Sequence, residues 1–166
     1  FPYTTLFRSY QNQDLPQMCA IWNAIVAQGM AFPQEELLDE AGAETFFSAQ
    51  SKTRVCILED TTVCGLYILH PNNVGRCSHI CNASFAVDAN QRGKQIGRRL
   101  VEDCMETAKA LGFRILQFNA VVESNTAARH LYESLGFTAL GMIPKGFRQL
   151  DGRYANIVPY YITLIP

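Results

Sequence analysis

The chain has 166 residues, of which 48% are apolar, with a formal net charge of −1 and a pI of about 6.3. This length allows one domain with a buried core, and the near-neutral charge gives no general attraction to nucleic acid or anionic membranes. Because no apolar run of roughly 18 residues occurs, we expect no membrane span, and no signal peptide is evident.

The first nine residues, FPYTTLFRS, resemble the translation of a common sequencing-adapter oligonucleotide. We therefore expect residues 1–9 to be an artefact and residues 10–166 to form a single native domain. Asp14 then caps a predicted helix, because Leu15-Pro16 fits a first turn and apolar residues recur at helical spacing up to Gly29.

The following segment predicts short helices and a hairpin. Residues 35–40 and 44–50 favour two helices interrupted near Gly42. Residues 54–59 and 63–69 predict two strands joined across Asp60-Thr61-Thr62, and a loop is predicted over 70–76.

A strand–turn–helix–strand–helix succession comes next, and this order is typical of a mixed α/β sheet. The predicted pieces are a strand over Ser78–Val87, a turn over Asp88–Gly97, a helix over Arg98–Leu111, a strand over Arg114–Val122, and a helix carrying Asn125 and Tyr132. The last predicted pieces are a strand over Thr138–Ile143, a loop over Pro144–Tyr154 and a strand over Ile157–Ile165.

The turn has the composition of a phosphate site. Gly93 lets the backbone approach an anion closely, and free N–H groups over 93–98 would point at it near the positive end of a helix. Arg92, Lys94 and Arg98 add positive charge. The alternative is an ordinary strand-to-helix turn with basic residues on its surface.

Two motifs together resemble the GNAT superfamily of acyl-CoA-dependent N-acetyltransferases. The superfamily's pyrophosphate motif, V-x4-[RQ]-x2-G-x-[GA], is matched by Val87-x4-Arg92-x2-Gln95-x-Gly97, with Gln95 departing from glycine. Its second cofactor motif is matched by Asn125-x2-Ala128-x2-Leu131-Tyr132-x3-Gly136-Phe137. The resemblance spans residues 10–164.

This resemblance implies the GNAT fold, an α/β domain with a mixed, mostly antiparallel central sheet of about six to seven strands and about four helices packed on both faces. It implies acetyl-CoA as co-substrate and, as is common in the superfamily, a homodimer through the C-terminal strands. The cofactor-binding residues carried over are Phe85, Ala86, Val87, Arg92, Gly93, Lys94, Gln95, Ile96, Gly97, Arg98, Asn125, Ala128 and Tyr132.

Tyr132 is the predicted acid for the leaving thiolate, as its counterpart is in the superfamily. It lies two helical turns after Asn125, so both face the same way. The alternatives are a core tyrosine and, for Asn125, a helix cap. Phe32 lies where the superfamily walls its acceptor pocket, although a packed aromatic in a plain turn is the alternative.

Asn82 and Asn119 interrupt apolar strands, where asparagine is disfavoured. We expect them to line the cleft where the strands part, with Asn119 and Asn125 as catalytic amides and Asn82 and Asn119 contacting the acceptor. The alternative is a structural hydrogen bond, since a buried amide must be satisfied.

A narrower resemblance concerns the acceptor. Pro71 to Arg76, the pair Cys81-Asn82 and Phe118-Asn119-x5-Asn125 are similar to a GNAT subgroup that includes fungal acetyltransferases of L-azetidine-2-carboxylate and cis-4-hydroxy-L-proline. In that subgroup such asparagines position the imino acid.

A metal site is disfavoured. Cys77 and Cys81 on one strand would lie ~13 Å apart, too far to share a zinc ion. The base that deprotonates the amine stays unassigned, with Glu123 and His79 as weak candidates. The six cysteines, which include no Cys-x-x-Cys pair, favour reduced thiols and a cytoplasmic location over disulfides. They are Cys19, Cys56, Cys64, Cys77, Cys81 and Cys104.

The sequence therefore predicts an N-acetyltransferase that moves acetyl from acetyl-CoA to a small-molecule amine by direct attack, with no nucleic-acid, membrane or metal partner. Two alternatives remain open: a peptide or protein N-acetyltransferase, and a non-catalytic acetyl-CoA-binding module.

Overall fold

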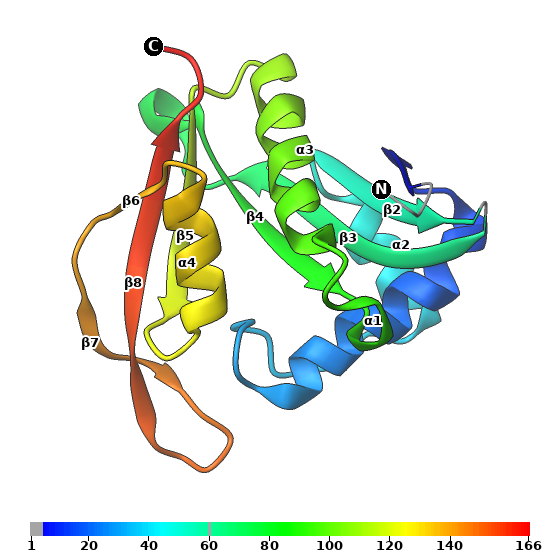
Figure 1. The fold of residues 1–166 in the computed structure, drawn as a ribbon, viewed down its shortest axis with the longest axis horizontal. Helices are drawn as coiled ribbons and strands as arrows, with labels where there is room; N and C mark the ends of the chain where they lie inside the picture. Colours follow the sequence, from blue (N-terminus) through cyan, green and yellow to red (C-terminus); the bar gives the residue numbers. More distant parts are fainter. Residues whose placement is uncertain (1–4, 60) are drawn as a thin grey trace.

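The computed structural model describes residues 5–59 and 61–166, so the predictions for Phe1 to Thr4 and for Asp60 in the hairpin turn lie outside it. One mixed sheet runs through the described chain and carries helices on both faces (Figure 1). The predicted α/β architecture, with its mostly antiparallel sheet, is confirmed. No helix in these ranges is long and apolar enough to span a bilayer.

The sheet has eight strands in the order β1-β2-β3-β4-β5-β8-β6, with β7 paired to β8. Only the β4–β5 pair is parallel among the described ladders. The strands are β1 (Thr5–Ser9), β2 (Lys52–Leu58), β3 (Thr62–Pro71), β4 (Ile80–Val87), β5 (Ile115–Val122), β6 (Thr138–Ala139), β7 (Ile143–Arg148) and β8 (Tyr154–Thr163).

The helices pack on opposite faces of the sheet, each pair over its own hydrophobic core. Because side chains alternate along a strand, Val55 and Ile57 of β2 pack on one face with Trp22, whereas Cys56 of β2 packs on the other face with Leu100. The first core lies under α1 (Leu15–Gln28) and α2 (Glu40–Ser48). The second lies under α3 (Ile96–Ala110) and α4 (Thr126–Ser134).

Three sequence predictions of secondary structure are wrong. The strand predicted over Thr138–Ile143 is interrupted at residues 140–142, which separate β6 from β7. α2 is one helix that runs through Gly42, because the Asp39 carboxylate caps it by accepting a hydrogen bond from the Gly42 N–H at 2.6 Å; residues 35–39 are not helical. The predicted loop over 144–154 contains most of β7, which pairs with β8 and adds a strand to the expected six or seven.

Part of the adapter-like segment is structured. Thr5–Ser9 form edge strand β1, antiparallel to β2. Arg8 donates to the buried carboxylate of Asp14 at 2.7 Å, so Asp14 binds Arg8 and the Gln11 N–H at 2.8 Å instead of capping α1 with its side chain. Burial opposes ionisation of Asp14, but these hydrogen bonds outweigh it and lower the pKa of its carboxyl. That residues 1–9 are foreign to the native domain stays a prediction.

We expect Arg8→Ala to lower the free energy of unfolding at pH 7 by about 1–3 kcal/mol, because it leaves the Asp14 carboxylate buried without its cation. A lowered pKa contributes stability above the unfolded-state value near 4, and this contribution is lost as pH falls through the folded-state value. The difference between wild type and variant should therefore shrink below about pH 4. Urea denaturation at several pH values measures it.

The matched control is Arg153→Ala, which removes an ion pair to Asp151 between two largely exposed side chains. It should change stability by less than about 0.5 kcal/mol. Equal effects of the two variants would show that β1 is not anchored through Arg8.

Candidate active site

An opening forms where β4 and β5 separate. Their described ladder has two pairs, Ile80 with Ile115 and Cys81 with Leu116. Beyond it, β4 stays paired to β3 as far as Val87, whereas β5 stays paired to β8. The β5-facing edge of β4 therefore presents backbone N–H and C=O groups to the opening instead of to a strand.

A pocket of about 280 Å³ lies at this opening, and we call it the β4–β5 pocket. The structure brings together here seven of the predicted site residues from four parts of the chain. They are Phe32 after α1, Asn82 and Phe85 of β4, Asn119 of β5, and Asn125, Ala128 and Tyr132 at the start of and within α4.

Tyr132 lies on the aromatic side of this pocket. Its ring centroid is 4.5 Å from that of Phe118, 5.7 Å from that of Phe137 and 5.9 Å from that of Tyr160. Burial, with a smaller contribution from nearby Cys104, raises the pKa of Tyr132 above its ordinary value. A tyrosine is protonated at neutral pH even at its ordinary pKa, so the Tyr132 phenol can serve as a proton donor, and burial makes its phenolate less favourable.

The amides lie on the polar side. Asn125 is the N-cap of α4, as one interpretation of the sequence had it, and its Oδ1 accepts from the Ala128 N–H at 3.3 Å. This leaves its NH₂ group available for a ligand. Asn82 and Asn119 also line this pocket. Asn82 is half-buried, and Asn119 is exposed at an irregularity of β5 between Phe118 and Val121.

The turn between β4 and α3, residues 88–95, has two left-handed residues. Gly93 has φ 83° and Gln95 has φ 58°. α3 begins at Ile96, two residues earlier than predicted, and its first backbone hydrogen bond to the turn runs from the Arg99 N–H to the Gln95 carbonyl at 3.1 Å. The N–H groups of 96–98 therefore form the positive end of the helix.

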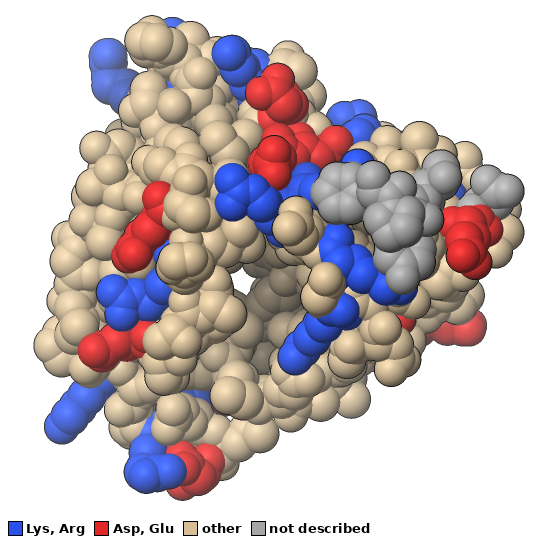
Figure 2. Space-filling view, viewed as in Figure 1, with Lys and Arg blue, Asp and Glu red and all other residues tan. Residues whose placement is uncertain are grey.

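Basic side chains surround this end of α3. Figure 2 shows a hollow near the middle of the face, with blue side chains on the side where the β4–α3 turn lies in Figure 1. Arg98 donates to the Ser134 hydroxyl of α4 at 3.0 Å and lies 3.4 Å from Glu102. Lys94 donates to Gln91 at 2.6 Å, which holds it against the turn.

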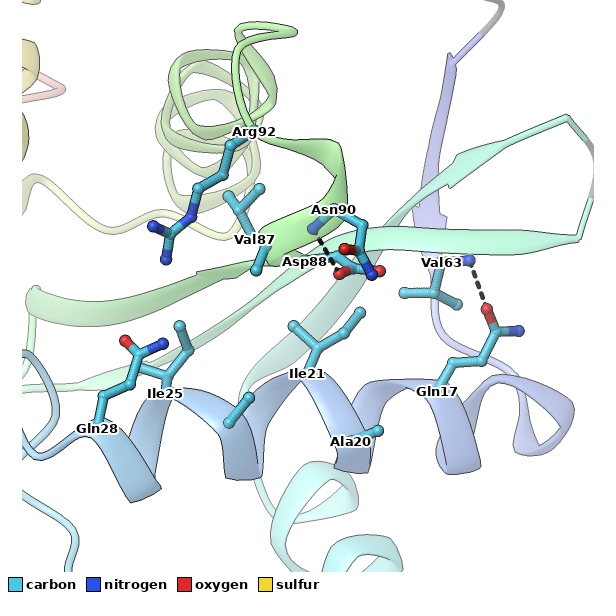
Figure 3. A pocket seen from close by; sticks show the side chains of 12 residues that line it. Gln17, Ala20, Ile21, Ile25, Gln28, Val63, Val87, Asp88, Asn90 and Arg92 are labelled. Atoms are coloured by element: carbon cyan, nitrogen blue, oxygen red, sulfur yellow. Dashed lines mark hydrogen bonds between the residues drawn. The ribbon is translucent and has the colours of Figure 1, made fainter.

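A second cavity, of about 410 Å³, lies between α1 and the β4–α3 turn. Figure 3 shows Arg92 reaching from the turn toward Gln28 of α1, beside Val87 and above Ile25. Val87 and Arg92 line this cavity and are not among the residues that line the β4–β5 pocket with Tyr132. Ala86 is buried against the α1 core, so only its backbone can reach a cofactor.

The weak candidates for a base do not line the β4–β5 pocket. Glu123 accepts a hydrogen bond from Asn156 at 2.8 Å and lines a different cavity with Arg129. His79 is exposed ahead of β4. Within the described residues, no three His, Cys, Asp or Glu side chains gather as metal ligands.

Sequence reasoning missed Ser84, which lines the pocket two residues after Asn82. The period-two rule for strands could have found it, because alternate residues share a face. It also assigned no role to Asn72, which hydrogen-bonds Asn119 from outside the pocket.

Gln95→Gly should raise the free energy of unfolding by about 1 kcal/mol, because glycine adopts a left-handed backbone without the steric cost that Gln95 bears. The same change at Gln13, which lies in a short 3₁₀ helix, should lower it. Denaturant unfolding of both variants checks the sign. A loss of stability in Gln95→Gly would show that its side chain is needed at this turn.

Comparison with known proteins agrees with the fold. The acetyltransferase (GNAT) family pattern matches residues 17–137. A GCN5-related N-acetyltransferase from Kribbella flavida superposes with a TM-score of 0.87 at 33% identity, covering 96% of this chain and 97% of that one. The yncA protein of Salmonella typhimurium, solved with its cofactor acetyl-CoA, gives a TM-score of 0.90 at 20% identity, covering 98% and 95%.

Curated relatives differ in their sequence identity to this chain and in the share of their length that it spans. N-acetyltransferase aca1 of Schizosaccharomyces pombe is 41% identical over 60% of this chain, which spans 47% of its length. The chain thus spans about half of that relative, and 13% of Protein SPT10 of Saccharomyces cerevisiae. An L-methionine sulfoximine/L-methionine sulfone acetyltransferase of Pseudomonas paraeruginosa is 27% identical, with 92% and 91% covered. Family pattern and fold together show that the chain belongs to the GNAT acetyltransferase family.

Proposed function

We propose that the chain transfers the acetyl group of acetyl-CoA to the amine of a small molecule. One observation carries the proposal: the β4–β5 pocket joins a protonated tyrosine and three asparagine amides beside an unpaired strand edge. The relatives support it, since yncA is solved with acetyl-CoA and the Pseudomonas enzyme is named for small amino-acid analogues.

The first helical turn of α3 is the proposed pyrophosphate site. Its N–H groups and the bases of the β4–α3 turn favour an anion there. Gly97 would let a phosphate approach the backbone closely. A Cβ at this position would lie 3.8 Å from the Val87 side chain and 4.0 Å from that of Leu131, which are ordinary contacts. The protein's own packing therefore does not require glycine, whereas a phosphate lying against the backbone would.

The proposed chemistry is direct attack of the amine on the thioester carbonyl. Holding both reactants in one pocket supplies much of the rate. N–H groups on the free edge of β4 and amide N–H groups stabilise the oxyanion, and Tyr132 protonates the departing thiolate. A cysteine acyl-enzyme is disfavoured, because Cys81 is buried and burial raises the pKa of its thiol to about 12.

Removal of the amine proton is assigned to water. The described lining of the pocket contains amides, the Ser84 hydroxyl and aromatic rings, and it contains no carboxylate that could act as the base.

The acceptor is proposed to be compact, because the pocket has a volume of about 280 Å³. The fungal subgroup resemblance makes a cyclic imino acid the finer proposal, with peptides as the alternative that the acceptor panel below separates.

Tyr132→Phe should lower kcat by about 10- to 100-fold while acetyl-CoA still binds. A thiolate with a pKa near 8.5 needs only modest help to leave, so some activity should remain. Steady-state kinetics and calorimetric titration with acetyl-CoA measure the two effects. Tyr154→Phe, at an exposed tyrosine, is the control. An unchanged kcat removes Tyr132 from the mechanism.

Asn82→Ala should raise the KM for the acceptor by about tenfold, the loss of one hydrogen bond, and leave the Kd for acetyl-CoA within about twofold. Asn12→Ala, at an exposed residue outside the pocket, controls for the substitution itself. If neither constant changes, Asn82 is structural.

The proposed function is tested by incubating the protein with acetyl-CoA and a panel of amines, and reading products by mass. Mass is preferred to a thiol dye because the chain has six cysteines. The panel contains azetidine-2-carboxylate, cis-4-hydroxyproline, amino acids, polyamines and short peptides. An acetylated small amine supports the proposal. Acetylated peptide alone overturns it, and no product despite acetyl-CoA binding favours a non-catalytic module.

A further inference from the structure

We infer that Asn72 is a positioning residue: it holds the Asn119 amide so that Asn119 acts only as a hydrogen-bond donor in the β4–β5 pocket. This inference deepens the proposed function and rests on it. The two side chains are 47 residues apart in sequence and form a reciprocal amide pair. Asn119 Nδ2 donates to Asn72 Oδ1 at 2.7 Å, and Asn72 Nδ2 donates to Asn119 Oδ1 at 3.1 Å.

A third amide completes the arrangement. Gln117 Nε2 also donates to Asn119 Oδ1, at 3.0 Å. An amide oxygen has two lone pairs, so Oδ1 of Asn119 is saturated by Asn72 and Gln117. An amide nitrogen has two N–H groups, and Asn72 takes one of them. The side chain therefore offers the pocket one N–H and no acceptor.

The pair also reaches across the sheet. Asn72 follows β3, and its backbone N–H donates a hydrogen bond of 2.8 Å to the backbone carbonyl of Ile80, at the start of β4. Asn119 lies on β5, on the other side of β4 in the strand order, at the irregularity next to Phe118. Asn72 does not line the pocket, so it acts there through Asn119.

The consequence is chemical. A side chain with only an N–H to offer binds an electron-rich oxygen, such as the thioester carbonyl or a carboxylate of the acceptor, and it cannot receive the proton of the amine. Both ligands share this oxygen chemistry. The two contacts affect different kinetic constants. Loss of a contact to the developing oxyanion lowers kcat, whereas loss of a contact to the acceptor carboxylate raises the KM for the acceptor.

The test compares four variants using whichever amine the wild-type protein acetylates. Asn119→Asp keeps an oxygen for Gln117 but removes the N–H, so kcat/KM for the amine should fall by about tenfold or more, as in Asn119→Ala. Asn72→Ala should lower it by about tenfold with the Kd for acetyl-CoA unchanged. Asn73→Ala is the matched control, because it removes a neighbouring asparagine whose side-chain oxygen accepts a hydrogen bond from the Val74 N–H at 2.8 Å.

The double variant measures the coupling between Asn72 and Asn119 directly. If Asn72 acts through Asn119, the double variant Asn72→Ala/Asn119→Ala is no worse than Asn119→Ala alone. Additive losses, a normal kcat/KM in Asn72→Ala, or full activity in Asn119→Asp would each overturn the inference.

A spectroscopic readout separates this inference from the proposed function. In ¹H–¹⁵N spectra, the Asn119 side-chain NH₂ signal, identified by its loss in Asn119→Asp, should shift in Asn72→Ala and stay in place in Asn73→Ala. An unshifted signal in Asn72→Ala contradicts the amide pair. If the wild-type protein acetylates no amine, the proposed function fails, and this spectrum alone decides whether Asn72 holds Asn119.

Discussion

The site depends on one constraint, the short parallel pairing of β4 with β5. After two residue pairs the strands are held by different neighbours, β4 by β3 and β5 by β8. The backbone groups that would otherwise close the sheet are left facing a pocket. A sheet that continued its ladder would have no place for a thioester between these strands, and the amides of Asn82 and Asn119 would lie on a closed surface.

Electrostatics at the two ends of the opening differ in kind. At the β4–α3 turn, full charges and helix N–H groups suit a phosphate, and their strength is reduced by solvent at this exposed position. Inside the pocket the polar groups are neutral amides, the Ser84 hydroxyl and the buried, protonated phenol of Tyr132. Neutral donors stabilise charge that develops during a reaction without binding a charged ground state tightly, which suits acyl transfer at a thioester.

Local pattern predicts the parts of this fold that are locally determined. β4, β5 and α4 follow from strand and helix periodicity, and the spacing of Asn125 and Tyr132 places both in one pocket. The helix cap at Asp39 is local, but Gly42 indicated a helix break, so this cap was missed. Features that depend on distant partners cannot be predicted this way: β7 forms by pairing with β8, and the irregularity of β5 exposes Asn119. The bond between Asn72 and Asn119 joins loop and strand across β4, so no local rule reaches it.

The most direct test of this account is a crystal structure of the protein with acetyl-CoA bound. The account predicts the pyrophosphate on the N–H groups of 96–98 and the thioester in the β4–β5 pocket. There the sulfur would lie within hydrogen-bonding reach of the Tyr132 hydroxyl, and the carbonyl oxygen would lie near an amide or β4 N–H. A thioester in the cavity beside α1, or a Tyr132 hydroxyl turned away from the sulfur, would contradict it.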